Sequence, residues 1–486
     1  MPDIKPFWPN YIDGEWVEGG EGWLPVLDPA TGQEIAKQAL ADAADIDRAV
    51  SAARTCFQTG VLAAMRPCDL GRMVRRMGDY LLDHIEEIAP ILTLESGKSL
   101  WESRIEIQGA ARFFEYYGGQ AETMEGVSIP LGQNFLDFTV NEPYGVTAHV
   151  IPWNYPVEMT ARSLAPALAT GNTCVIKTPE LDPLTNAYLV EAAEAVGFPK
   201  GAVNILCGHG KTAGAALVSH PDVDQIVFTG SVQTGRSIAV AAAHNLVPCV
   251  LELGGKSAAI VYPDADLDQF IDSVRWGIYF NAGQVCSAMS RIILHEDIHD
   301  DFVERIVDLA KGLDVGPGIG FPEFGMNMGP MISEPQRDRA EAICRQAESD
   351  GAVAVTGGRR LNRDGFFLQP TVFTNVTPDM NVARDEIFGP VTSVLKFRSD
   401  KDAMDIANGT DFGLVGGVFT EDLERAMDVA RKIRGGQVFV NEWYAGGVET
   451  PFGGTGQSGY GREKGREAMR NYVTTKNIGI ATRKGR

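Results

Sequence analysis

The stretch VTAHVIPWNYP, residues 146–156, joins a short apolar run of β type to a loop that two prolines stiffen. Short apolar runs of this kind then alternate with helical patterns as far as about residue 262. The other predicted strands are 173–176, 203–206, 225–229, 250–253 and 258–261, and helical patterns include 184–196 and 235–244. This alternation is typical of a parallel sheet with helices on both faces. The sequence therefore predicts an α/β fold with ligands at the carboxyl ends of the strands.

The rest of the chain extends this pattern. Asp13-Gly14 between β-forming residues predicts a hairpin over 11–17. A second α/β stretch is expected from about 264 to 445, and turn-forming residues predict surface and cleft loops over 364–388. Further helices are expected at 42–57, 67–85, 99–124, 266–280, 300–311 and 334–349, and further strands at 391–397 and 437–441.

Composition argues against several kinds of partner. The 43 Lys and Arg against 64 Asp and Glu give a net charge of −21, which repels nucleic acids and anionic membranes. No apolar run approaches the about 20 residues that a membrane-spanning helix needs. The first six residues, MPDIKP, lack the basic and then apolar layout of a signal peptide, so a cytoplasmic location is expected.

One of the seven cysteines lies in a setting that suits reaction. Cys286 belongs to the segment NAGQVCS, residues 281–287, where Gly283 allows a close approach and small neighbours leave room beside the sulfur. Most of the others lie in contexts typical of the core. Their odd number and the lack of a CxxC pair give neither a complete disulfide framework nor a zinc signature. We therefore expect Cys286 to be a nucleophile in an open cleft.

Two motifs at predicted strand ends supply groups that such a nucleophile needs. Glu252, between two leucines, is expected to be desolvated, which would raise its pKa and suit it to general-base catalysis. Asn154, held between two prolines, could donate to a developing oxyanion. Each has a structural alternative, namely a buried ion pair of Glu252 with Lys256 and a plain aromatic–proline turn around Asn154.

Two further motifs suit a nucleotide. Lys177 and Glu180 follow a predicted strand and could hold the two hydroxyls of a ribose, although their spacing alone favours a surface ion pair. The sequence FTGS, residues 228–231, opens a helix whose N-terminus could hold a phosphate. It is not the GxGxxG fingerprint, and a structural turn explains it about equally well.

Together these motifs are more specific than any one of them. They occur in the order PWNYP (152–156), KTPE (177–180), FTGS (228–231), ELGGK (252–256), GQVC (283–286), EIFGP (386–390) and PFGG (451–454). This series closely resembles the NAD(P)-dependent aldehyde dehydrogenase superfamily over nearly the whole chain. The resemblance implies a Rossmann-like NAD-binding domain, an α/β catalytic domain and a small β oligomerisation arm that builds a homodimer or homotetramer. The implied boundaries are 1–124 with 147–253, then 254–445, and 125–146 with 471–486.

The resemblance also implies a role for each matching residue. Cys286 would be the nucleophile, Glu252 the general base, and Asn154 the oxyanion donor beside the backbone N–H of Cys286. A thiohemiacetal on Cys286 would lose hydride to the cofactor, and Glu252 would activate the water that hydrolyses the resulting thioester. Relatives that acylate coenzyme A lack this glutamate, so a free carboxylic acid is the expected product. The residues implied to contact the cofactor are Ile151, Pro152, Trp153, Lys177, Glu180, Gly230, Ser231, Leu253, Glu386 and Phe388.

Cofactor and substrate preference follow from fewer residues. Glu180 would repel a 2′-phosphate, so NAD is favoured over NADP, although relatives with this glutamate sometimes use both. The residues expected at the substrate entrance are Arg162, Met159, Tyr155 and Trp443. Succinate-semialdehyde dehydrogenases resemble this chain in having arginine at the place of Arg162, and a guanidinium suits a carboxylate. We therefore expect a small aldehyde, with a preference for one that carries an anionic group.

The substrate prediction leaves alternatives open. Arg162 could instead pair with a protein acid such as Glu158, and the second arginine of the semialdehyde enzymes is Phe280 here. An aromatic wall from Trp443 and Tyr444 would suit an aromatic or a cationic, betaine-type aldehyde.

Two other classes of protein compete with a dehydrogenase. A cysteine hydrolase would need a histidine partner, and none of the seven histidines lies in a loop of comparable motif quality. A non-catalytic structural relative would be expected to lose Cys286 or Glu252, and both are present.

Overall fold

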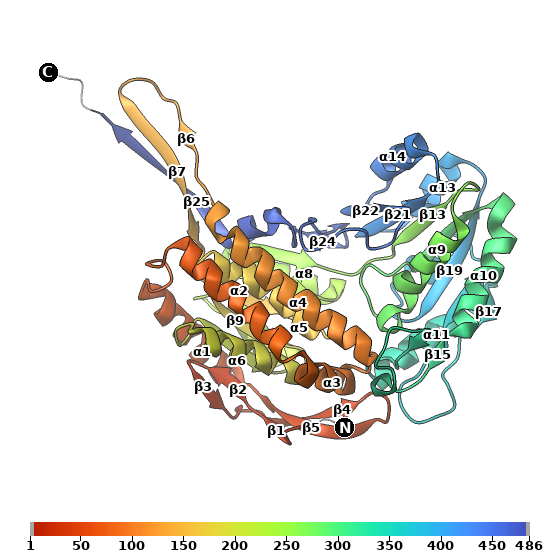
Figure 1. Ribbon diagram of the computed structural model, residues 1–486, viewed down its shortest axis with the longest axis horizontal. Coiled ribbons are helices and arrows are strands. Elements are labelled where there is room, and N and C mark those ends of the chain that lie inside the picture. Colours follow the sequence, from red (N-terminus) through yellow and green to blue (C-terminus); the bar gives the residue numbers. More distant parts are fainter. Residues whose placement is uncertain (1–3, 483–486) are drawn as a thin grey trace.

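The computed structural model describes residues 4–482, and two large sheets organise them (Figure 1). The first sheet has eight strands in the order β24-β12-β11-β8-β9-β10-β2-β3. Its centre is parallel and almost wholly buried, as expected of a sheet that helices cover on both faces. The strands are β24 Gly459–Tyr460, β12 Cys249–Glu252, β11 Gln225–Thr229, β8 Val146–Val150, β9 Thr173–Thr178, β10 Val203–Cys207, β2 Asn10–Ile12 and β3 Glu15–Val17.

The predicted hairpin joins the last two of these strands. Asp13 and Gly14 have φ values of 51° and 79°, the left-handed pair that a tight primed turn requires. β2 and β3 pair antiparallel on either side of this turn. The prediction of a hairpin over 11–17 is confirmed.

Helices pack on both faces of the first sheet. One apolar core contains residues of α2 to α6, and a second core on the other face contains residues of α1, α7 and α8. The predicted helix through 67–85 is wrong at its end, because the backbone leaves helical geometry at His84 (φ −109°, ψ 13°) and α3 starts afresh. The bounds are α1 Ala43–Gln58, α2 Pro67–Asp83, α3 Ile85–Ser96, α4 Leu100–Gln120, α5 Pro156–Ala169, α6 Ala187–Val196, α7 Ala215–Ser219 and α8 Val232–Asn245.

The second sheet has seven strands in the order β17-β18-β19-β14-β13-β21-β22. The predicted strand 258–261 is β13 of this sheet, not part of the first α/β unit, because it pairs with β14 and β21. The segment 364–388, expected to be loops alone, also contains β18 and the short helix α12, Asn381–Arg384. The strands are β17 Val353–Thr356, β18 Thr371–Thr374, β19 Val391–Phe397, β14 Arg291–His295, β13 Ala258–Val261, β21 Val415–Phe419 and β22 Gln437–Val440.

Helices also flank this second sheet, and its two apolar cores lie on opposite faces. The helix predicted over 266–280 is α-helical only as far as Val274 and continues as a π-turn over Arg275–Tyr279. The helices are α9 Leu267–Val274, α10 His299–Gly312, α11 Glu334–Ser349, α13 Asp400–Ala407 and α14 Leu423–Lys432. Within the described residues, none of the helices in the protein combines the length and the apolar character needed to cross a membrane.

A third sheet leaves the body of the molecule as a ribbon (Figure 1). Its strands are β25 Val473–Ala481, β7 Phe135–Pro143 and β6 Ser128–Ile129, and β25 pairs antiparallel with the whole of β7. The predicted arm also includes 483–486, which lie outside the described residues. The remaining strands are β1 Phe7–Trp8, β4 Gly22–Asp28, β5 Gln33–Leu40, β15 Asp314–Val315, β16 Asn327–Met328, β20 Phe412–Gly413 and β23 Thr455–Gly456.

Candidate active site

A cavity of about 350 Å³ brings together side chains that follow strands of both sheets. Asn154 comes after β8, Glu252 is the last residue of β12, and Cys286 lies in the loop before β14. All three line this cavity. The motifs that the sequence singled out, separated by as many as 132 residues, therefore meet at one place.

The loop that carries Cys286 has an unusual backbone. Asn281, Ala282 and Gly283 have φ values of 48°, 51° and 71°, all in the left-handed region. A Cβ at Gly283 would lie 2.2 Å from the carbonyl oxygen of Gly389, so this position needs glycine. The predicted close approach to Gly283 is thus made by the backbone of the EIFGP segment, which packs against the loop of Cys286.

The side chain of Cys286 is only partly exposed. Burial raises its pKa to about 12, and the nearby carboxylates of Glu386 and Glu252 act in the same direction. Arg162 acts in the opposite direction but does not cancel the effect of burial. The resting side chain is therefore a neutral thiol that must lose its proton in order to react.

The side chain of Glu252 is only 2% exposed. Neither of its carboxylate oxygens has a hydrogen-bond partner in the described part of the chain. Burial raises its pKa well above 4.5, and Arg162, whose Nη2 lies 4.0 Å from Oε2, opposes that rise. The predicted desolvation is confirmed. The alternative ion pair with Lys256 is not formed among residues 4–482.

The loop of Asn154 is tied down at both its side chain and its backbone. The Nδ2 group donates to the carbonyl oxygen of Gln284 at 3.0 Å. The Asn154 carbonyl accepts from Lys98 Nζ at 3.0 Å and from Asn281 Nδ2 at 2.9 Å. One side-chain N–H is used by Gln284, so the second N–H of the amide remains for another acceptor.

Arg162 lies on α5 one turn after Met159, and both side chains line the cavity as predicted. Its Nε is 2.5 Å from Glu463 Oε2, and its guanidinium lies 4.5 Å from the ring centroid of Phe452. The alternative that Arg162 pairs with an acid is therefore correct, but the acid is Glu463 and not Glu158.

Glu463 and its neighbour Lys464 belong to none of the motifs described above. Lys464 lines the cavity, and Glu463 reaches it through Arg162. They belong to the segment GREKG, residues 461–465, shortly after the PFGG motif. Three charged residues between two glycines were the available signal. Burial lowers the pKa of Lys464 to about 8, and Arg162 acts in the same direction.

The predicted contact of Trp443 with the substrate is wrong, because the cavity wall contains Tyr444 and not Trp443. The indole Nε1 of Trp443 donates to the carbonyl of Ser287 at 3.2 Å, and its ring is packed 5.4 Å from that of Phe439. Only 3% of Trp443 is exposed, so it packs behind the residues that line the cavity, such as Phe439. Tyr155, by contrast, lies on the wall as predicted.

The same cavity continues toward residues predicted to contact a nucleotide. Those that line it are Pro152, Trp153, Gly230, Ser231, Leu253, Glu386 and Phe388. Ser231 caps α8, and its Oγ accepts from the Thr234 N–H at 3.2 Å. Glu386 accepts from the Gly255 N–H at 2.9 Å, and burial raises its pKa to about 7.

Lys177, Glu180 and Ile151 lie near this region but do not line the cavity. Lys177 Nζ is 2.9 Å from Glu180 Oε2, at the carboxyl end of β9, so an ion pair is present. It is not the surface ion pair of the structural alternative, because Lys177 is buried. Glu180 also accepts from the Gly210 N–H at 2.9 Å. Burial tends to raise the pKa of Glu180, but Lys177 and this N–H outweigh it, so the pKa is lowered.

Cys286, Glu252 and Asn154 therefore share one cavity with Gly230 and Ser231, at the N-terminus of α8. The family model described as "Aldehyde dehydrogenase family" matches residues 16–478. The chain belongs to the aldehyde dehydrogenase family and is thus an oxidoreductase.

Similar proteins agree with this assignment. Retinal dehydrogenase 2 of Homo sapiens is 40% identical over 474 residues, which cover 97% of this chain and 91% of that protein. Hydroxyisobutyraldehyde dehydrogenase of Mycolicibacterium austroafricanum is 40% identical over 478 residues, covering 97% and 93%. A crystal structure of betaine aldehyde dehydrogenase from Staphylococcus aureus in complex with NAD⁺ is 37% identical, covers 98% and 95%, and has a TM-score of 0.95.

Proposed function

We propose that this protein oxidises a small aldehyde to the carboxylic acid with NAD, through a thioester on Cys286. The observation that carries the proposal is the meeting of Cys286, Glu252 and Asn154 in one cavity, which also contains Glu386 and Phe388. Cys286 loses its thiol proton to solvent and the sulfur adds to the aldehyde carbonyl. The free N–H of Asn154 and the backbone N–H of Cys286 donate to the resulting oxyanion.

Glu252 completes the cycle. Its unpaired, desolvated carboxylate can take a proton from the water that attacks the thioester on Cys286. As the carboxylic acid leaves, Glu252 passes this proton to the sulfur, and the thiol is restored. Arg162 lies 4.0 Å from Glu252 and is paired with Glu463. This ion pair fixes one positive and one negative charge next to the Glu252 carboxylate.

The residues around the cavity fit NAD. We propose that the N-terminus of α8, with Gly230 and Ser231, holds the pyrophosphate, since its first N–H groups point out of the helix. Lys177 and Glu180 would hold the adenine ribose, and Glu386 the nicotinamide ribose. When bound, NAD supplies the acceptor for the hydride of the thiohemiacetal. The NAD-bound structure of the similar betaine aldehyde dehydrogenase supports this proposal, and Glu180 favours NAD over NADP.

The other predicted contacts support the same cofactor. Pro152, Trp153 and Leu253 line the cavity on this side, while the backbone N–H of Ile151 donates to the carbonyl of Lys177 at 3.0 Å. Trp153 and Phe388 meet edge to face, with centroids 5.1 Å apart. Together they provide an apolar boundary for the reacting ring.

For the substrate we propose an aldehyde with an anionic tail, such as a semialdehyde. Two cationic side chains, Arg162 and Lys464, line the cavity on the side of α5. Glu463 neutralises Arg162, whereas Lys464 has no carboxylate within 4.0 Å among the described residues. Lys464 therefore supplies the positive charge most available to a carboxylate.

A second candidate substrate is an aromatic or cationic aldehyde. Glu158 also lines the cavity, together with the rings of Tyr155, Phe280 and Phe452. Burial and the nearby Glu106 raise the pKa of Glu158 to about 7, so it carries a negative charge above that pH. A carboxylate among aromatic rings suits an ammonium group.

A substrate panel decides between these proposals. We expect Lys464→Met to lower kcat/KM for succinate semialdehyde about 10-fold more than for propanal, because it removes the cation near the tail that no carboxylate neutralises. Benzaldehyde and betaine aldehyde complete the panel, with NADH followed at 340 nm and NADP run in parallel. Arg162→Ala is the matched loss of a cation that Glu463 already neutralises. If Lys464→Met changes all four aldehydes by the same factor, Lys464 does not select the substrate.

We also propose that the ribbon of β6, β7 and β25 joins copies of this chain into a homodimer or homotetramer. Apolar side chains such as Phe135, Leu136 and Ile480 are exposed along it. Exposed apolar strands favour pairing with another chain. Light scattering of the purified protein should give two or four chains, and a monomer would contradict the proposal. We also propose that the nucleotide-binding and catalytic domains divide at residues 253–254.

A further inference from the structure

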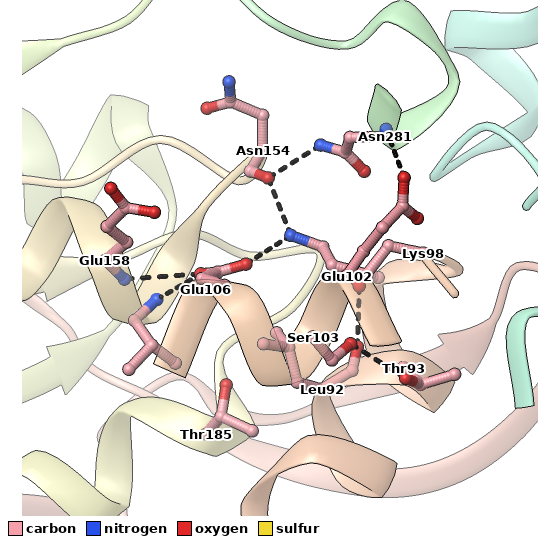
Figure 2. Close-up of polar contacts among 12 residues, drawn as sticks. Leu92, Thr93, Lys98, Glu102, Ser103, Glu106, Asn154, Glu158, Thr185 and Asn281 are labelled. Atoms are coloured by element: carbon pink, nitrogen blue, oxygen red, sulfur yellow. Dashed lines mark hydrogen bonds and ion pairs between the residues drawn. The ribbon is translucent and has the colours of Figure 1, made fainter. Parts of the chain in front are cut away.

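The region at the start of α4 reaches both loops of the proposed oxyanion site (Figure 2). Lys98, two residues before the helix, donates from Nζ to the carbonyl of Asn154 at 3.0 Å and forms an ion pair with Glu106. Both charged side chains are 1% exposed. A buried lysine thus holds the backbone of the residue whose side chain is the proposed oxyanion donor.

Glu106 fixes the other side of the same loop. Its Oε1 accepts from the backbone N–H groups of Val157 and Glu158 at 3.0 and 3.3 Å, in the first turn of α5. The N-cap residue of α5, Tyr155, makes no side-chain cap of its own. A carboxylate from α4 therefore caps α5, which begins two residues after Asn154.

Glu102, one turn earlier on α4, holds the second loop. Its Oε1 accepts from the Asn281 N–H at 2.8 Å, at the left-handed start of the loop that leads to Cys286. Asn281 in turn donates from Nδ2 to the Asn154 carbonyl at 2.9 Å. Figure 2 shows the Asn154 carbonyl between Lys98 and Asn281, so α4 connects the two loops.

Lys98, Glu102 and Glu106 do not line the cavity. Direct contact with the substrate therefore does not explain why these charged side chains are buried here. Buried charges are costly, and apolar residues of similar size are often as stabilising. Charges are, however, suited to holding backbone carbonyl and N–H groups in fixed places. Here those groups belong to the two loops that must be aligned.

We propose that Lys98, Glu102 and Glu106 are positioning residues that align the side-chain amide of Asn154 with the backbone N–H of Cys286. This inference rests on the oxyanion roles proposed above for those two groups. A small misplacement of such donors is costly, since shifts of about 1 Å can lower rates on the order of 10²-fold.

The test compares Glu102→Ala with variants that separate positioning from stability. Glu102→Ala is expected to lower kcat about 10-fold or more, with the aldehyde KM and the NAD affinity, followed by protein fluorescence, within about twofold of wild type. Glu102→Gln keeps an acceptor for the Asn281 N–H and should recover most of the loss. If Glu102→Ala does not fold, Lys98→Met/Glu106→Gln removes both buried charges together and should show the same split of kcat from KM.

Two serines provide matched controls. Ser99→Ala removes the hydroxyl that donates to Glu102 at 2.5 Å but leaves the bond to Asn281, so it reports the loss of the α4 cap alone. Ser103→Ala removes a buried hydrogen bond between Ser103 on α4 and Thr93 on α3. Both should keep wild-type kcat even where the melting temperature falls. Equal loss of kcat in Ser99→Ala and Glu102→Ala would overturn the positioning role.

Asn154→Ala separates failure of this inference from failure of the proposed function. It should lower kcat on the order of 10²-fold, and Glu102→Ala added to it should cost less than it does alone, because both act on one group. If Asn154→Ala is impaired but the two losses multiply, the positioning role is wrong and the oxyanion role stands. If Asn154→Ala keeps wild-type kcat, the oxyanion role fails and the positioning role fails with it.

Discussion

Cys286→Ala is expected to abolish NADH formation with every aldehyde, a loss on the order of 10⁴-fold or more. The reason is covalent: without the sulfur neither the thiohemiacetal nor the thioester can form. The readout is absorbance at 340 nm, with NAD binding measured separately by protein fluorescence. The variant should still bind NAD, because the proposed cofactor contacts lie on β9, α8 and the EIFGP segment.

Cys68→Ala is the matched control, since Cys68 is a partly exposed free thiol on α2. It should keep full activity. Turnover by Cys286→Ala within about tenfold of wild type, or equal losses in the two variants, would refute the nucleophile and reopen the class of reaction.

Glu252→Gln is expected to stop the cycle halfway. The first turnover should release about one NADH per active site, after which the steady rate should be lower on the order of 10²–10⁴-fold, because the general base for hydrolysis is gone. Intact-protein mass spectrometry should then show the acyl group on the peptide that contains Cys286. The double variant Cys286→Ala/Glu252→Gln should show neither the burst nor the adduct.

The pH profile of the wild-type enzyme also tests whether Glu252 is the general base for hydrolysis. The raised pKa of Glu252 means that the carboxyl is protonated, and unable to accept a proton from water, below that pKa. Hydrolysis of the thioester should therefore rise with pH and level off above the pKa of Glu252. A burst-free Glu252→Gln whose steady rate keeps the wild-type pH dependence would show that another group is the base.

Much of the fold could be predicted because strand and helix signals are local. The strands at 225–229, 258–261 and 391–397 have the expected bounds. What local signals could not give is sheet membership: the strand at 258–261 follows the first unit in sequence but pairs in the second sheet. The ends of elements near special backbone, such as His84, were also beyond a pattern of apolar spacing.

In the site, too, local motifs are predictable from the sequence and contacts between distant residues are not. Cys286, Glu252 and Asn154 are predictable because each lies in a short motif, and the cavity contains all three. Tyr444, not Trp443, reaches the cavity because Tyr444 has a φ of 69°, and a left-handed residue changes the direction in which side chains point. Glu463 is not predictable from the sequence, because its importance arises only from its contact with Arg162, about 300 residues away in sequence.

The short strand β24 has a consequence for the order in which the protein becomes active. It carries the chain back from the second sheet to pair with β12, beside Glu252. Gly453, a few residues before β24, packs against Glu252, since a Cβ there would lie 2.7 Å from Glu252 Oε1. Glu463, a few residues after β24, pairs with Arg162. During synthesis from the N-terminus, every strand of the two large sheets except β24 can thus form before this wall of the cavity exists. The reactive pocket is finished by the segment that leaves the ribosome after them, so catalytic competence should be acquired late, as one of the last events of folding.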